Sequence, residues 1–88
     1  MTNVALNTLI WKEGKLYVSY VPQLEVASCG KTIAQAKKNI KEALWLFLEE
    51  AEAMGTLRDI LEEAGLTRRR QAWQAAERVS VSKVRVAV

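Results

Sequence analysis

The feature that most constrains the fold is a long amphipathic helix predicted between Thr32 and Gly55. Thr32 and Gln35 form a T-x-x-Q capping box, a pattern that satisfies free backbone donors at a helix N-terminus. Gly55 is typical of the position just past a helix C-terminus. Apolar residues recur between these ends at the spacing of a helix that lies on a sheet: Ile33, Ala36, Ile40, Leu44, Phe47, Ala51 and Met54. The rest of the chain must supply that sheet.

The segments before this helix alternate in the manner of β-strands. Residues 3–11 predict a first strand with both faces fairly apolar, and residues 16–21 predict a second strand, joined to the first by a turn at Gly14. Pro22 cannot donate a ladder hydrogen bond, so the second strand ends there or lies at an edge. Residues 25–29 predict a short third strand.

Further elements are predicted after the long helix. Thr56 is expected to cap a short second helix that ends at Gly65. Residues 67–77 show weak periodicity and predict either a loop or a frayed helix. The C-terminal end predicts an extended strand, in which a bulge or bend at residues 82–83 would keep the valines directed inward: Val79, Val81, Val84, Val86 and Val88.

The predicted order is βββ-α-α-β. It favours an α+β fold, with a small and mostly antiparallel sheet and with the helices packed on one face. The 88 residues fit a single domain spanning residues 1–88. Because a domain of this size buries a limited core, we also expect a homo-oligomer, either a dimer or larger.

The composition favours a cytoplasmic protein. Cys29 is the single cysteine, so it cannot form an internal disulfide, and we expect a buried structural thiol in a reducing compartment. The N-terminus lacks a basic stretch followed by an apolar block, so no signal peptide is expected. No apolar run is long enough to predict a membrane span.

Residues suited to catalysis or metal binding are sparse. The chain has no histidine, which excludes a Ser-His-Asp or Cys-His arrangement within one chain. A metal-dependent nuclease needs converging carboxylates, and the predicted strand regions offer only Glu13, Glu25 and Glu77. We therefore predict a non-enzymatic protein without catalytic residues, cofactor or metal. A weak metal-dependent nuclease that uses Glu25 is a further hypothesis.

Residues 16–52 resemble the HicB-like antitoxin family. The resemblance rests on Pro22 and Leu24 at a corner between strands, on Gly30 and Thr32 before the helix, and on a set of helix residues: Ala36, Asn39, Ile40, Glu42 and Ala43. It implies a HicB-like, partial ribonuclease-H-type fold in a short form without a separate C-terminal DNA-binding domain. It also implies that the protein binds and occludes a small basic HicA-like ribonuclease toxin. An orphan HicB-like protein with another binding partner is the alternative.

The long helix also carries apolar residues outside its stripe. Trp45 and Leu46 lie there, and tryptophan is enriched at the centre of protein interfaces. We predict a partner interface on this helical face, with support from the last strand, and its candidate residues are Lys41, Trp45, Leu46, Glu49, Val84 and Val86. The alternative is that the second helix or the tail covers Leu46 and that Trp45 lies flat beneath Lys and Glu side chains.

Positive charge concentrates at the C-terminal end. Residues 67–88 carry six basic residues and one acidic residue, within a chain whose net charge is +3. Arg68, Arg69 and Arg70 could contact phosphates while the Trp73 ring stacks on a base, which would make the protein a nucleic-acid binder. The alternative is a solvated loop with Trp73 packed on the core. Protein binding is the favoured prediction, nucleic-acid binding the second, and no membrane partner is expected.

Overall fold

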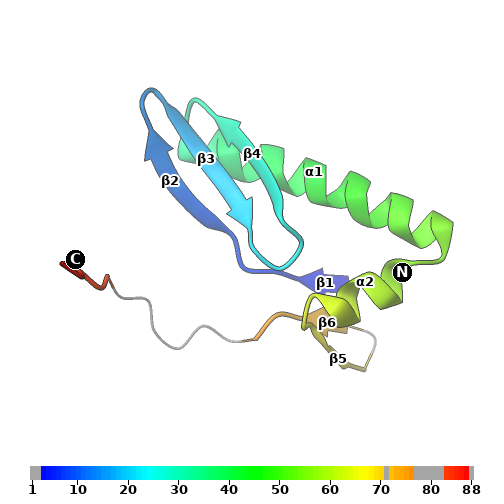
Figure 1. Ribbon diagram of the computed structural model, residues 1–88. Helices are drawn as coiled ribbons and strands as arrows, with labels where there is room; N and C mark the ends of the chain where they lie inside the picture. Colours follow the sequence, from blue (N-terminus) through cyan, green and yellow to red (C-terminus); the bar gives the residue numbers. More distant parts are fainter. Residues whose placement is uncertain (1–2, 71, 77–82, 88) are drawn as a thin grey trace.

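The protein is described by a computed structural model for residues 3–70, 72–76 and 83–87 (Figure 1). Its class is α+β, as predicted. In chain order the elements are β1 (Asn3–Ala5), β2 (Leu9–Glu13), β3 (Leu16–Val21), β4 (Val26–Gly30), α1 (Ile33–Met54), α2 (Leu57–Glu63), β5 (Thr67–Arg69) and β6 (Ala72–Gln74).

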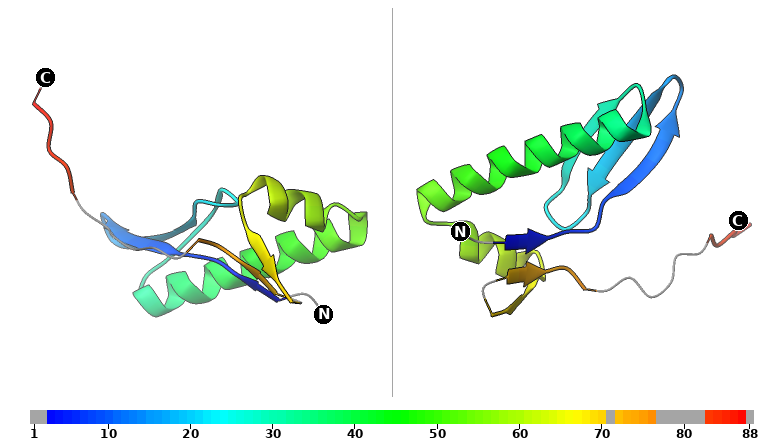
Figure 2. Two further views of the ribbon diagram at one scale, coloured as in Figure 1. Left: turned by 90° about the horizontal axis from the view of Figure 1, so that it is seen from below. Right: turned by 180° about the vertical axis from the view of Figure 1, so that it is seen from behind.

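The strands form two three-stranded sheets, where the sequence predicts one. The first sheet has the order β2-β3-β4 and is antiparallel throughout. The second has the order β1-β6-β5, with β1 parallel to β6 and β5 antiparallel to β6. The predicted first strand is divided because residues 6–8 leave the strand conformation between β1 and β2. β1 and α2 lie beneath the C-terminal half of α1 in Figure 1, and the right-hand view of Figure 2 shows the same arrangement from behind.

The N-terminal half of α1 packs on β3 and β4. Ala36 and Ile40 are buried in this contact, together with Val21 of β3. Ser19, a buried polar residue, is accommodated because its hydroxyl donates a hydrogen bond of 2.9 Å to the Ala36 carbonyl oxygen. Gly30 permits the close approach, since a Cβ added there would lie 2.6 Å from the Ala36 nitrogen.

Both predicted ends of α1 are confirmed. The Gln35 backbone nitrogen donates to the Thr32 hydroxyl at 3.0 Å. The Gln35 side-chain oxygen accepts from the Lys31 nitrogen at 2.6 Å, one residue before the expected capping-box donor. At the other end, Gly55 adopts a left-handed φ of 77°, and its nitrogen donates to the Glu52 carbonyl at 3.1 Å.

The predicted apolar stripe of α1 is only partly buried. Ala36, Ile40 and Ala51 are buried, whereas Ile33, Phe47 and Met54 are exposed. A helix of 22 residues is about 33 Å long, which is longer than the six-residue β3 that supports it. The stripe therefore extends beyond the sheet.

A second cluster of apolar side chains lies near the C-terminal half of α1. Its buried centre consists of Leu61, Leu66 and Trp73, from α2, the following turn and β6. Partly buried residues from β1, the β1–β2 connection, α1 and α2 pack against it: Val4, Leu6, Leu48, Leu57 and Ala64. This cluster attaches the small β1-β6-β5 sheet to the helices.

Several predictions for the second half of the chain are wrong. Within residues 67–77, where a loop or frayed helix is predicted, Thr67–Arg69 and Ala72–Gln74 form the β5–β6 pair, because Trp73 is anchored in the core beside β1. The Thr56 side chain does not cap α2, since its hydroxyl donates back to the Ala51 carbonyl at 3.3 Å.

The predicted final strand is absent from residues 83–87. These residues form no sheet, and Val84 and Val86 are 79% and 77% exposed rather than directed inward. The strand that joins the N-terminal β1 from the second half of the chain is β6, and residues 83–87 pair with none of the edge strands. Val79, Val81 and Val88 lie outside the described residues.

Candidate protein-binding surfaces

An open groove of about 690 Å³ runs along α1. One wall is a face of α1, and the opposite wall comes from β1, the β1–β2 connection and β2, with Leu57 of α2 at one side. The residues of α1 that line it are Lys37, Ile40, Lys41, Leu44, Trp45, Leu48, Glu49 and Glu52, and those of the opposite wall are Asn3, Val4, Leu6, Thr8 and Ile10. We call this feature the α1 groove.

The α1 groove extends from the part of α1 that packs on the sheet, at Lys37 and Ile40, to the part that continues past it. Four of the apolar residues that line it also pack against the second core cluster: Val4, Leu6, Leu48 and Leu57. The groove is therefore an open side of the core rather than an isolated surface depression. Trp45 lies at the middle of the helical wall and is 62% exposed.

Charged residues flank this apolar middle in an ordered way. Lys37 and Lys41 line the N-terminal part of the helical wall, and Glu49 and Glu52 line the C-terminal part. The ion pair recorded within the described residues, Arg58–Glu62, lies on α2 and involves none of the four. These charges can therefore pair with groups on a second molecule.

A second uncovered apolar surface lies on the β2-β3-β4 sheet. Ser19 faces α1, so the residues in the opposite phase of each strand point away from the helix. We call this the outer sheet face; it consists of one charged residue, Glu13, at its edge and of Leu9, Trp11, Leu16, Val18, Tyr20, Ala27 and Cys29. Neither helix covers it in Figures 1 and 2.

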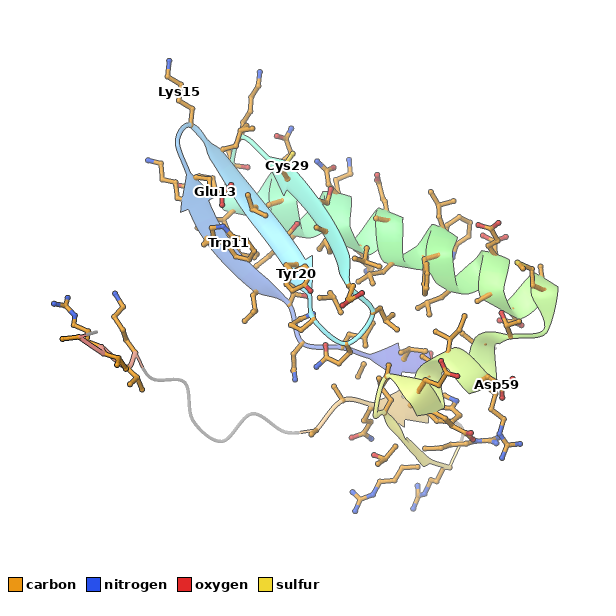
Figure 3. The ribbon with its side chains drawn as sticks, viewed as in Figure 1. Trp11, Glu13, Lys15, Tyr20, Cys29 and Asp59 are labelled. Atoms are coloured by element: carbon orange, nitrogen blue, oxygen red, sulfur yellow. The ribbon has the colours of Figure 1, made fainter. Side chains whose placement is uncertain are left out.

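Aromatic side chains give the outer sheet face a defined shape. The rings of Trp11 and Tyr20 meet edge to face, with centroids 6.3 Å apart and planes inclined by 73°. Figure 3 shows both residues on the sheet. The Trp11 indole nitrogen also donates to a Glu13 carboxylate oxygen at 3.1 Å, yet Trp11 remains 40% exposed and Leu16 43% exposed.

The outer sheet face is not among the surfaces predicted from the sequence, although the sequence contains a pattern that indicates it. Residues 4–11 are apolar in both phases of their alternation, and a strand with two apolar faces needs a cover on each side. The prediction of a buried Cys29 thiol is wrong, because the outer sheet face is not covered by a helix. β4 places Cys29 on the face opposite α1, where it is exposed.

The predicted partner-interface residues separate into three places. Lys41, Trp45 and Glu49 lie together along the α1 groove. Leu46 is exposed and is not among the groove residues, and within the described residues neither α2 nor the tail buries it. Val84 and Val86, in the extended residues 83–87, are likewise absent from the groove lining.

The predicted nucleic-acid patch does not come together. Arg68, Arg69 and Arg70 are exposed on β5 and the turn after it, and the Arg68 Nε donates to the Arg70 carbonyl at 3.2 Å. Trp73 is only 6% exposed and belongs to the second core cluster. Its ring is therefore unavailable for stacking on a base, and the arginines alone offer phosphate contacts.

The carboxylates proposed for metal binding are also apart. Glu13 lies at the end of β2, and Glu25 lies in the β3–β4 turn with a left-handed φ of 55°. Glu77 lies outside the described residues. Across residues 3–70, 72–76 and 83–87, no three acidic or cysteine side chains gather as a metal site would require.

Comparison with known proteins adds no family assignment. No family model, no curated protein and no solved structure matches this chain. The resemblance to HicB-like antitoxins therefore stays a prediction from the sequence. Of the helices that the structure describes, neither has the length and apolar composition needed to span a membrane.

Proposed function

We propose that this chain is a non-enzymatic protein-binding module that contacts its partner through the outer sheet face. The observation that carries the proposal is the edge-to-face pair of the exposed Trp11 ring and the half-buried Tyr20 ring, on an apolar sheet surface that neither helix covers. An antiparallel sheet with one face on the core normally presents polar side chains on the other. Contiguous exposed apolar surface, with Trp and Tyr within it, is typical of a protein interaction site.

The energetic argument favours coverage of this face by another protein. Each 100 Å² of apolar surface removed from water contributes about 2.5 kcal/mol. Trp11 and Leu16 retain a large part of their surface in the isolated chain. Aromatic side chains at the centre of a patch commonly dominate binding energy, so Trp11 is the expected anchor.

Within this class, we propose that the partner is a small basic ribonuclease of the HicA-like toxin type. The resemblance of residues 16–52 to HicB-like antitoxins supports this choice of partner. β3, β4 and the capped helix α1 occur in the order that the resemblance implies. The mechanism would be occlusion, in which the bound module covers the toxin active site and excludes RNA. An orphan HicB-like protein would bind a different protein with the same surface.

Co-expression with the small protein encoded next to this chain tests the proposal. We expect the two proteins to co-purify and the chain to rescue growth when the neighbour is toxic. Trp11→Arg should abolish both effects, whereas Lys15→Ala, at the exposed hairpin turn, should leave both intact. Circular dichroism of each variant establishes that it is folded. If the unmodified chain neither co-purifies with its neighbour nor rescues growth, the antitoxin proposal is wrong.

A further inference from the structure

We propose that a second copy of this chain occupies the α1 groove, with the two α1 helices packed antiparallel about a two-fold axis at Trp45. This inference goes beyond the proposed function, because it concerns the α1 groove and not the outer sheet face. It rests on the order of charges along the helical wall of the groove and on the exposed apolar residues between them.

The charges along the groove are arranged symmetrically and with opposite sign about Trp45. Lys41 lies four residues before Trp45, and Glu49 lies four residues after it. Lys37 lies eight residues before Trp45, and Glu52 lies seven residues after it. At a rise of about 1.5 Å per residue, the second pair departs from perfect symmetry by about 1.5 Å, which flexible side chains can span.

An antiparallel two-fold arrangement converts this symmetry into complementarity. Each Lys41 then lies level with Glu49 of the other copy, and each Lys37 lies close to Glu52 of the other copy. A parallel arrangement would place lysine opposite lysine and glutamate opposite glutamate. The same surface therefore attracts a copy of itself in one orientation and repels it in the other.

The apolar middle of the groove supplies the contact that such a pair would bury. Trp45 of each copy lies at the two-fold axis, flanked by Leu44 and Leu48 of the groove lining. The opposite wall offers Val4, Leu6 and Ile10 and no charged residue. An incoming helix thus meets mainly apolar side chains on both walls, with the uncharged polar residues Asn3 and Thr8 on the opposite wall and charges only toward the ends of the helical wall.

The two kinds of contact have different roles. Exposed ion pairs contribute little to affinity, so the four lysine–glutamate pairs of the dimer would mainly fix register and orientation. A largely exposed tryptophan at the centre of an interface is the usual source of binding energy. Trp45 should therefore supply most of the binding energy, whereas Lys41 and Glu49 should decide how the copies align, and like charges placed at these positions should oppose binding.

Sedimentation equilibrium on the full chain without any partner tests the inference. We expect a mass near twice the 9.9 kDa of the monomer at high concentration, dissociating on dilution. Trp45→Ala should raise the dissociation constant at least about tenfold, because it removes the central contact. A monomer at every concentration, or a dimer that Trp45→Ala leaves unchanged, would overturn the inference.

A charge swap tests the antiparallel register. Lys41→Glu and Glu49→Lys should each raise the dissociation constant about tenfold, since each places two like-charge contacts in the dimer. The double variant Lys41→Glu/Glu49→Lys restores opposite charges and should return it to within about threefold of the original. Glu50→Lys, the same charge change one residue along and outside the groove lining, is the matched control and should have little effect. If the double variant binds no better than the single variants, the antiparallel register is wrong.

These measurements use the purified chain alone, and the outer sheet face is unaltered in every variant. Failure to dimerise therefore leaves the proposed binding of a partner protein intact. Conversely, loss of co-purification in the Trp11→Arg variant leaves self-association through the α1 groove intact. The two proposals can thus fail separately.

Discussion

At the scale of single residues, Gly30 controls how closely α1 approaches β4. A Cβ at this position would lie 2.6 Å from the Ala36 nitrogen and 2.8 Å from the Gln35 carbonyl carbon, both of which are backbone atoms. Backbone atoms cannot rotate away, so Gly30→Ala must displace the helix. We expect it to lower the free energy of unfolding by about 1–3 kcal/mol, measured by urea denaturation. Cys29→Ala, at the exposed neighbouring position, is the control and should change it by less than about 0.5 kcal/mol.

Ser19 makes the polar contact between the sheet and the helix. Its hydroxyl is fully buried and donates to the Ala36 carbonyl oxygen. Ser19→Ala should lower the free energy of unfolding by about 1 kcal/mol, because the hydrogen bond is lost while the packing is nearly preserved. Ser19→Val should cost more, about 1–3 kcal/mol, because it adds volume where α1 and β3 already touch. Thermal denaturation that ranks valine as the milder change would contradict this account of the contact.

The sequence predicted these residues with uneven success, for a physical reason. Strand alternation shows that Cys29 and Ser19 belong to opposite faces, but it does not show which face a helix will cover. The thiol was therefore expected inside, and the structure places it outside. The packing of Trp73 on the core, one of the two alternatives for this segment, is confirmed, since Val4 of β1 and Leu61 of α2 belong to the cluster around it.

At the scale of elements, the ends of α1 were the most predictable features. They depend on local chemistry, namely a hydroxyl that accepts from the third helical residue and a glycine with positive φ. Thr32→Ala should reduce the free energy of unfolding by about 1 kcal/mol, because the Gln35 nitrogen loses its acceptor. Thr32→Ser keeps the acceptor and should retain most of the stability. Equal losses for alanine and serine in urea denaturation would show that the cap contributes nothing.

The elements that the sequence missed depend on distant contacts. β5 and β6 are three residues each, too short to establish an alternating pattern, and their position follows from the parallel pairing of β6 with β1, about seventy residues apart. The division between β1 and β2 likewise separates a strand that belongs to one sheet from a strand that belongs to the other. Local propensity shows neither that β6 pairs with β1 nor that β1 and β2 belong to different sheets.

At the scale of the whole molecule, the outer sheet face and the α1 groove have a common feature: each presents apolar side chains that the described residues do not cover. Within the described residues, the three-stranded sheet leaves Trp11 and Leu16 exposed on one side, and α1 leaves Trp45 exposed along the groove. Among the residues that the structure describes, no element covers the outer sheet face and no helix packs along the α1 groove. The sequence indicates uncovered apolar residues, because its predicted first strand is apolar on both faces and because Trp45 lies outside the apolar stripe of the long helix. Only the arrangement of the elements shows that these residues belong to two separate surfaces.

Removal of the C-terminal segment tests whether its valines cover apolar surface of the same molecule. Val84 and Val86 are almost fully exposed, and neither residue lines the α1 groove. A chain that ends at Ser82 should therefore unfold at the same urea concentration as the full chain, within about 0.5 kcal/mol in free energy, and should form the same dimer in sedimentation equilibrium. A loss of more than about 1 kcal/mol would mean that the valines bury apolar surface of their own molecule, the arrangement expected from their alternation alone. Unchanged stability with loss of the dimer would instead assign the self-association to the tail, and the α1 groove would then need a different partner.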